Sequence, residues 1–167
     1  AEIACDLAKA EFKELSGRRA LVIGSGVIGQ LCASLLQKGG ASVTMTLRRR
    51  KKEEFLPLQG VNFIPYDDRY SVASKADLII SATASPHYVL TSERFASDAG
   101  RVLILDLAVP HDVEPAIKDV DVVRLLDMDS MGGWSLDPEL LKDIRKAINS
   151  DMAYFFDWLK IHDCMPL

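Results

Sequence analysis

A glycine-rich run near the N-terminus has the spacing of a phosphate-binding loop. It follows an apolar stretch over 19–24, typical of a buried parallel strand, and it leads into a stretch with helical spacing. In that order the first glycine permits a tight turn, the second lets the backbone approach a pyrophosphate, and the third lets helix and strand pack closely. We therefore predict a dinucleotide-binding loop in preference to a turn without a ligand. Its residues are Gly24, Ser25, Gly26, Val27, Ile28 and Gly29.

A basic run, 48–52, follows the next expected strand and bears on the choice of dinucleotide. NAD-binding domains place Asp or Glu in this region to hold the ribose 2′-hydroxyl, and a carboxylate would repel a 2′-phosphate. A guanidinium binds a phosphate with paired hydrogen bonds. We therefore predict NADPH as the cofactor, with Arg48 and Arg49 as contacts. Two alternatives remain for this basic run. It could contact RNA phosphates, or Glu53 and Glu54 could neutralise part of its positive charge.

Small and polar residues follow the strands expected at 76–81 and 102–106. In a parallel α/β sheet, ligands bind beyond the carboxyl ends of the strands, and small side chains there let a nicotinamide ribose lie close to the backbone. An ordinary polar turn is the alternative. The predicted cofactor contacts on this edge are Ser81, Ala82, Thr83, Ala108 and Pro110.

Candidates for acid–base or nucleophilic chemistry are weak. His111 could act as a general acid or base, but no partner is visible in the sequence, and a capping or surface role is favoured. Asp106 and Asp112 could form a carboxylate pair, although turn and capping roles are more common. The cysteines have neither metal-ligand spacing nor a disulfide framework, which favours a reducing cytosolic setting. We predict no catalytic residue and no metal site. The cysteines are Cys5, Cys32 and Cys164.

Alternating strand and helix patterns predict the elements that position these residues. Ile3, Leu7 and Ala10 predict a helix over 2–13. Six buried strands imply an α/β fold, a Rossmann-like doubly wound parallel sheet with short crossovers after its second strand. The strands are expected at 19–24, 42–47, 61–65, 76–81, 102–106 and 122–126. The apolar face of the helix after the glycine loop is expected to contain Ile28, Leu31, Cys32, Leu35 and Leu36.

The C-terminal part has a different pattern. Asp137 is suited to a helix N-cap, and apolar residues at three- and four-residue spacing continue from Pro138 to about Asp163. Such a helix would be roughly 37 Å long. Phe156 and Trp158 lie off its apolar stripe, which favours contact with a partner or another domain over simple core packing. We predict a nucleotide-binding domain over 1–135, with a leading helix over 1–15, and a long connecting helix over 136–167.

Composition limits the class of protein. The chain has 167 residues, 49% hydrophobic and 26% charged, which suits one globular domain, or one domain plus an appendage, and excludes disorder. Its longest apolar stretches are too short to span a membrane. A net charge of −4 argues against a dedicated nucleic-acid-binding domain. The chain begins with Ala rather than Met, so we expect a piece of a longer protein.

Four stretches together resemble glutamyl-tRNA reductases. The most specific is the run 106–115, Asp-Leu-Ala-Val-Pro-His-Asp-Val-Glu-Pro, which departs from the family signature at His111, where the family has Arg. The run 81–86 is similar to the family's turn after the fourth strand, and 24–29 is similar to its dinucleotide loop. Four residues are similar to the pattern at the end of the family's long connecting helix: Phe155, Trp158, Leu159 and Pro166.

The resemblance implies that the chain is the NADPH-binding middle domain and the start of the spinal helix of a three-domain homodimer. In that family a cysteine of the N-terminal domain attacks glutamyl-tRNA, and hydride from NADPH then yields glutamate-1-semialdehyde for tetrapyrrole (porphyrin) biosynthesis. None of the three cysteines lies in the family's cysteine motif, so the chain is expected to be inactive alone. Leu47 stands where the family has Asn, which leaves more of the adenosine contact to Arg48 and Arg49.

Two other interpretations stay open. The first is a stand-alone NAD(P)-dependent dehydrogenase resembling precorrin-2 dehydrogenase, although the run 106–115 argues against it. The second is a non-catalytic nucleotide-binding or assembly module in which the long helix is the functional part.

Overall fold

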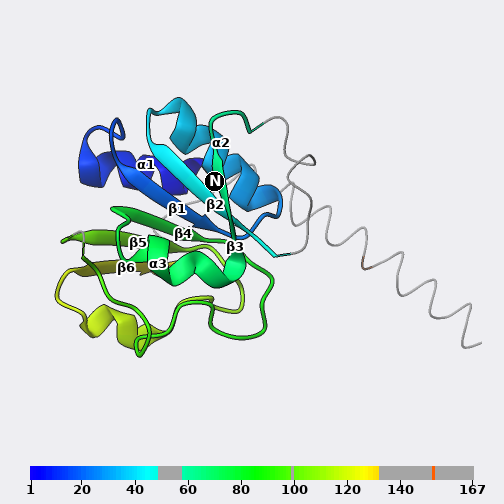
Figure 1. Cartoon of the computed structure of the whole chain (residues 1–167). Coiled ribbons are helices and arrows are strands. Elements are labelled where there is room, and N and C mark those ends of the chain that lie inside the picture. Colours follow the sequence, from blue (N-terminus) through cyan, green and yellow to red (C-terminus); the bar gives the residue numbers. More distant parts are fainter. Residues whose placement is uncertain (49–57, 99, 132–151, 153–167) are drawn as a thin grey trace, which may run out of the picture. The chain divides into compact units, whose positions relative to one another are not determined.

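The computed structural model describes residues 1–48, 58–98, 100–131 and 152. Within them the strands are β1 (Arg19–Ile23), β2 (Ser42–Leu47), β3 (Asn62–Pro65), β4 (Leu78–Ser81), β5 (Val102–Asp106) and β6 (Val123–Asp127). They form one parallel sheet in the order β3-β2-β1-β4-β5-β6 (Figure 1). The predicted α/β class and six-stranded Rossmann-like sheet are confirmed.

The order of the strands creates a switch point between β1 and β4. Val22 of β1 lies beside Met45 of β2 on one side and beside Ile80 of β4 on the other. The chain first winds outward through β2 and β3, and it then returns to the centre at β4. Parallel α/β sheets bind ligands beyond the carboxyl ends of the strands at such a point.

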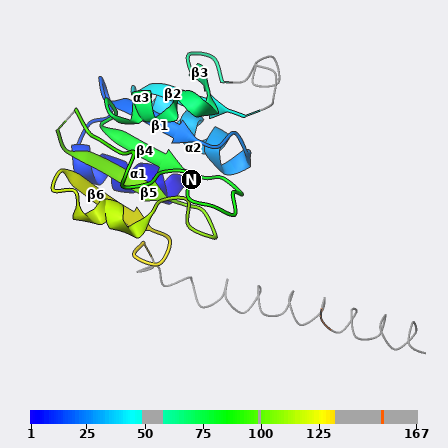
Figure 2. The ribbon, with the colours of Figure 1, turned by 60° about the horizontal axis from the view of Figure 1, so that its bottom comes forward.

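The sheet is covered on both faces. The helical elements are α1 (Glu2–Phe12), α2 (Val27–Lys38), η2 (Tyr66–Asp68), α3 (Arg69–Ala73) and η3 (Pro115–Asp119). α1 and α2 pack on one face, against residues that include Val22 and Ile80. α3, η3 and the links on either side of β5 cover the other face, where Leu21 and Ile79 point. Figures 1 and 2 show these layers. Because successive strand residues point to opposite faces, both sets are buried and the strands read as continuous apolar runs.

The links after β3 contain little helix over their described residues, as predicted for the crossovers after the second strand. α3 has five residues, and η3 is a five-residue 3₁₀ helix. The link from β4 to β5 consists of turns, bends and irregular backbone over its described residues, with one isolated bridge between Leu90 and Val113. These links still bury apolar side chains, including Leu90, Phe95 and Ile117, so the second face is covered by loops as much as by helices.

The buried faces of α1 and α2 differ from the predicted ones. Ile28 and Leu31 were expected to face the core, but 46% and 49% of their surface is exposed. Ile3 of α1 is also exposed. The residues buried by the two helices are mainly small: Ala4, Cys5, Ala8, Gly29, Cys32, Ala33 and Leu36. Small side chains let a helix lie close to its neighbours, so close packing selects this face over the one with larger residues.

The chain divides into the units Ala1–Met131 and Gly132–Leu167. The predicted long helix lies outside the described residues, and the boundary expected at residue 135 stays a prediction. No helix among the described residues is both long enough and apolar enough to cross a membrane.

Two leucines of α2 test the corrected helix face. Leu36 is fully buried, so Leu36→Ala should lower the free energy of unfolding by about 2–5 kcal/mol, because it removes packing and leaves a cavity. The matched control Leu31→Ala truncates a half-exposed side chain and should cost less than about 1 kcal/mol. Urea denaturation followed by circular dichroism measures both. Equal losses would contradict the assigned face.

Candidate functional site

A cavity of about 440 Å³ opens at the carboxyl ends of β1 and β4, at the switch point. The predicted contacts that line it are Gly24, Ser25, Gly26, Val27, Ile28, Arg48, Ala82 and Thr83. The lining residues that were not predicted are Thr46, Tyr66, Ala84 and Ser85. Thr46 lies near the end of β2 and Tyr66 directly follows β3, so the rule that ligands bind at strand ends could have found both.

The glycine loop is shaped by close backbone approaches. Gly24 has a φ of 110°, and a Cβ there would overlap the carbonyl oxygen of Ala82. A Cβ at Gly29 would overlap the carbonyl oxygen of Gly24. At Gly26, in contrast, a Cβ would meet no atom within 4 Å. The first and third glycines are therefore needed by the fold, and the second leaves open space for a ligand.

The N-terminus of α2 faces this space. The N-cap residue is Gly26, and no side chain caps the helix. Its first N–H groups are therefore available to an anion, and the helix dipole adds positive potential. The loop is braced by the Gly24 N–H, which donates to Thr46 Oγ1 at 3.2 Å, and by the Gln30 amide, which donates to the Ser25 carbonyl at 2.9 Å.

Arg48 stands at the junction of two cavities. Its guanidinium carbon lies 4.6 Å from the centre of the Tyr66 ring, and both residues line the first cavity. A second cavity of about 500 Å³ is lined by Leu47, Arg48, Pro65, Tyr66 and Asp67. Arg49, the other predicted contact, lies outside the described residues.

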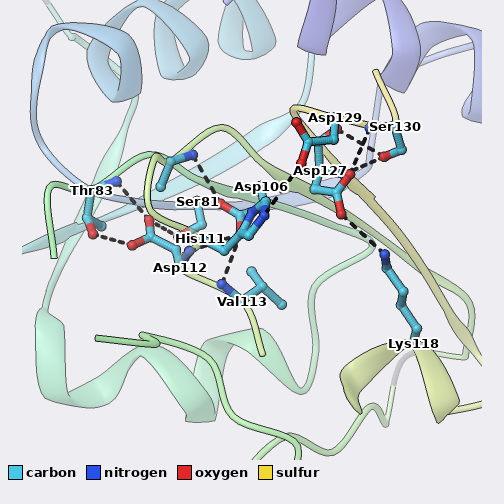
Figure 3. Close-up of polar contacts among 11 residues, drawn as sticks. Ser81, Thr83, Asp106, His111, Asp112, Val113, Lys118, Asp127, Asp129 and Ser130 are labelled. Atoms are coloured by element: carbon cyan, nitrogen blue, oxygen red, sulfur yellow. Dashed lines mark hydrogen bonds and ion pairs between the residues drawn. The ribbon is translucent and has the colours of Figure 1, made fainter. Parts of the chain in front are cut away.

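A buried carboxylate, Asp112, holds the turn after β4 (Figure 3). The Ser81 hydroxyl and the Thr83 N–H donate to Oδ2 of Asp112 at 2.7 and 2.8 Å, and the Thr83 hydroxyl donates to Oδ1 at 2.5 Å. Ser81 is therefore turned toward Asp112 and does not line the cavity, whereas Ala82 and Thr83 do.

A second buried carboxylate, Asp106, holds the loop after β5. It accepts backbone N–H bonds from Ala108, Asp112 and Val113 at 2.9–3.1 Å. Burial raises the pKa of Asp106, and the three N–H bonds counteract part of that rise. Both aspartates thus have turn-holding roles, as the sequence favoured. Ala108 is buried and Pro110 is exposed, and neither lines either cavity.

His111 lies beside Asp106. Its Nδ1 is 3.6 Å from Asp106 Oδ2, and its Nε2 is 3.9 Å from Asp129 Oδ2 (Figure 3). No partner for His111 was visible in the sequence, and the fold brings these two carboxylates near it because the loop folds back over the end of β5. Both distances exceed hydrogen-bond range, and Nδ1 is buried without a hydrogen-bond partner among the described residues.

The described cysteines are not suited to nucleophilic attack. Cys5 and Cys32 are buried free thiols. Burial raises the pKa of Cys5 to about 11, helped by the neighbouring Cys32 thiol, and burial also raises the pKa of Cys32. A thiol of raised pKa contains little thiolate at neutral pH, so both act as small core residues.

Known proteins provide an independent comparison. Residues 6–133 match the family model described as shikimate / quinate 5-dehydrogenase. A glutamyl-tRNA reductase of Acetivibrio thermocellus is 40% identical over 84% of this chain and 43% of its own length. Two solved structures also match. A glutamyl-tRNA reductase from Methanopyrus kandleri has a TM-score of 0.67 and 26% identity, covering 89% of this chain and 39% of that one. The nucleotide-binding domain of a Thermoplasma volcanium glutamyl-tRNA reductase, at 20% identity and a TM-score of 0.62, covers 85% of this chain and 94% of that one and supports the fold alone.

These matches confirm the resemblance to glutamyl-tRNA reductases that the sequence motifs indicated. The chain spans less than half the length of the curated relatives it matches.

Substitutions at two glycines of the loop should distinguish an effect on stability from an effect on cofactor binding. Gly29→Ala should lower the free energy of unfolding by about 1–3 kcal/mol, because its Cβ would overlap the Gly24 carbonyl. Gly26→Ala should cost less, about 1 kcal/mol or below, since its Cβ meets open space and only the N-cap preference is lost, and it should weaken binding of the predicted NADPH. Thermal denaturation and a fluorescence titration measure the two effects. An unchanged NADPH affinity in Gly26→Ala would contradict the proposed approach of the pyrophosphate.

The Asp112 contacts predict a large effect on folding. Asp112→Ala should lower the free energy of unfolding by about 2–4 kcal/mol, because the Ser81 hydroxyl and the Thr83 N–H lose their buried acceptor. The control Asp112→Asn preserves the shape and one amide oxygen, so its loss should be smaller. Urea denaturation compares the variants, and equal losses would show that the hydrogen bonds contribute little.

Proposed function

The chain belongs to the shikimate/quinate 5-dehydrogenase family, and from this premise we propose that it forms the NADPH-binding part of a glutamyl-tRNA reductase. The observation that carries the proposal is the 40% identity to such a reductase. The matching segment of this chain contains the cavity that is lined by the glycine loop and Arg48. The family membership supports a nicotinamide dinucleotide, and the basic residue at the end of β2 supports NADPH in particular.

The residues at the switch point fit such a cofactor. Gly26 leaves room for a pyrophosphate beside the uncapped N-terminus of α2. Arg48, with Arg49, is proposed to bind the 2′-phosphate, and Ala82 and Thr83 to contact the nicotinamide ribose. When bound, NADPH would supply the hydride for reduction.

The other predicted contacts are proposed to support the backbone around the cavity. Gly29 packs the helix against the loop, and Ser81 is fixed by Asp112 behind the cavity wall. Ala108 and Pro110 belong to the loop that Asp106 holds. These residues would keep the binding surface in place by supporting its backbone.

The activity of the whole protein is a further part of the proposal. We infer that the protein containing this segment reduces glutamyl-tRNA to glutamate-1-semialdehyde in tetrapyrrole biosynthesis, acts as a homodimer and works in the reducing cytosol. The free thiols of Cys5 and Cys32 are consistent with a reducing compartment. Since Cys5 and Cys32 are buried and none of the three cysteines, Cys164 included, lies in the family's cysteine motif, the cysteine that attacks the glutamyl ester is proposed to lie outside this segment.

A titration of the chain with NADPH and NADH tests the cofactor assignment. The chain should bind NADPH more tightly, and Arg48→Ala should reduce this preference by about 10- to 100-fold, because charge-assisted phosphate contacts are lost. Arg18→Ala is the matched control: Arg18 also stacks on an aromatic ring, that of Phe12, but it precedes β1, at the opposite edge of the sheet. An unchanged preference in Arg48→Ala would refute the 2′-phosphate assignment. In the full-length protein, the same substitution should raise KM for NADPH with glutamyl-tRNA as the second substrate.

A further inference from the structure

Three arginines and two tyrosines form an alternating stack that starts at the edge of the candidate site. We call it the cation–π ladder, and its members in order are Arg48, Tyr66, Arg69, Tyr70 and Arg94. The successive distances from guanidinium carbon to ring centre are 4.6, 4.0, 4.6 and 4.3 Å. All lie within the range at which a ring attracts a cation. Of these five residues, only Arg48 was recognisable in the sequence as a candidate contact.

Arg69 anchors the ladder. It is 8% exposed, its Nε donates to the Val89 carbonyl at 2.7 Å, and its Nη1 donates to the Tyr66 carbonyl at 3.1 Å. Among the described residues it has no carboxylate within ion-pair distance. Arg69 therefore holds Tyr66 through both the backbone and the ring, so the ring is a fixed surface.

The Tyr66 ring restricts the position of the Arg48 guanidinium. Its side chain is exposed, and within the described part of the chain it forms no ion pair, although Asp67 lines the same second cavity. A free arginine side chain loses rotamer entropy when a ligand fixes it. Stacking on Tyr66 restricts the guanidinium before any ligand arrives, and its N–H groups stay available for hydrogen bonds in its plane.

We propose that Tyr66 is a positioning residue that sets cofactor specificity by holding Arg48 at the junction of the two cavities, ready for a 2′-phosphate. The inference rests on the proposed NADPH function and adds a residue to it. A 2′-phosphate distinguishes NADPH from NADH, so a residue acting through Arg48 changes the ratio of the two affinities, whereas a residue that contacts parts shared by both nucleotides changes both affinities equally.

The test measures dissociation constants for NADPH and NADH in the unsubstituted chain and in five variants, one of which is Arg48→Ala alone. Tyr66→Leu removes the ring and should reduce the preference for NADPH by about two- to fivefold. Tyr66→Phe keeps the ring and should retain the preference. In an Arg48→Ala background, Tyr66→Leu should have no further effect on the ratio, because the residue through which it acts is gone. Phe12→Leu, which removes the ring beneath Arg18, is the control and should leave the ratio unchanged. If Tyr66→Leu fails to fold, Tyr66→Met replaces it.

The results that would contradict the role of Tyr66 differ from those that would contradict the proposed function. If the unsubstituted chain prefers NADPH but Tyr66→Leu retains that preference, the role of Tyr66 is wrong and the proposed function stands. A loss in Tyr66→Phe as large as in Tyr66→Leu, or a further loss in the Arg48→Ala background, also overturns the role. If the unsubstituted chain binds neither nucleotide, both the inference and the proposed function fall.

Discussion

The site depends on the close approach of three backbone segments at the switch point. The carbonyl of Gly24 occupies the space where Gly29 would carry a Cβ, and the carbonyl of Ala82 occupies the corresponding space at Gly24. Any side chain at these two glycines would separate β1, α2 and the turn after β4. Their contact brings the N-terminus of α2 to the carboxyl ends of the central strands, where the cavity opens.

Two buried carboxylates hold the turn after β4, which lines the cavity, and the loop after β5. Asp106 and Asp112 each accept three hydrogen bonds, and together these bonds tie the loop after β5 to the turn after β4. Burying a carboxylate is costly unless its oxygens are satisfied, so these contacts offset the burial and fix the loops in one arrangement. The two aspartates therefore act on the cavity through the backbone, and His111 is brought beside Asp106 by the same fold.

The predictions that succeeded depend on local pattern. Strands buried on both faces need continuous apolar runs, and a tight strand-to-helix turn needs glycine, so the strands and the loop could be recognised along the chain. The predictions that failed depend on packing. Ile28 and Leu31 follow a helical stripe, yet the helix buries mainly smaller residues because these allow close contact with the sheet.

The sequence by itself determined the class of fold, the family resemblance, the glycine loop and the basic residue at the end of β2. Tertiary structure alone decided which side chains meet there. Asp112 reaches Thr83 across 29 positions, and Arg69 reaches the carbonyl of Val89 across 20. Such partners are set by the order of strands in the sheet, which brings distant loops to one edge, and no spacing along the chain encodes them.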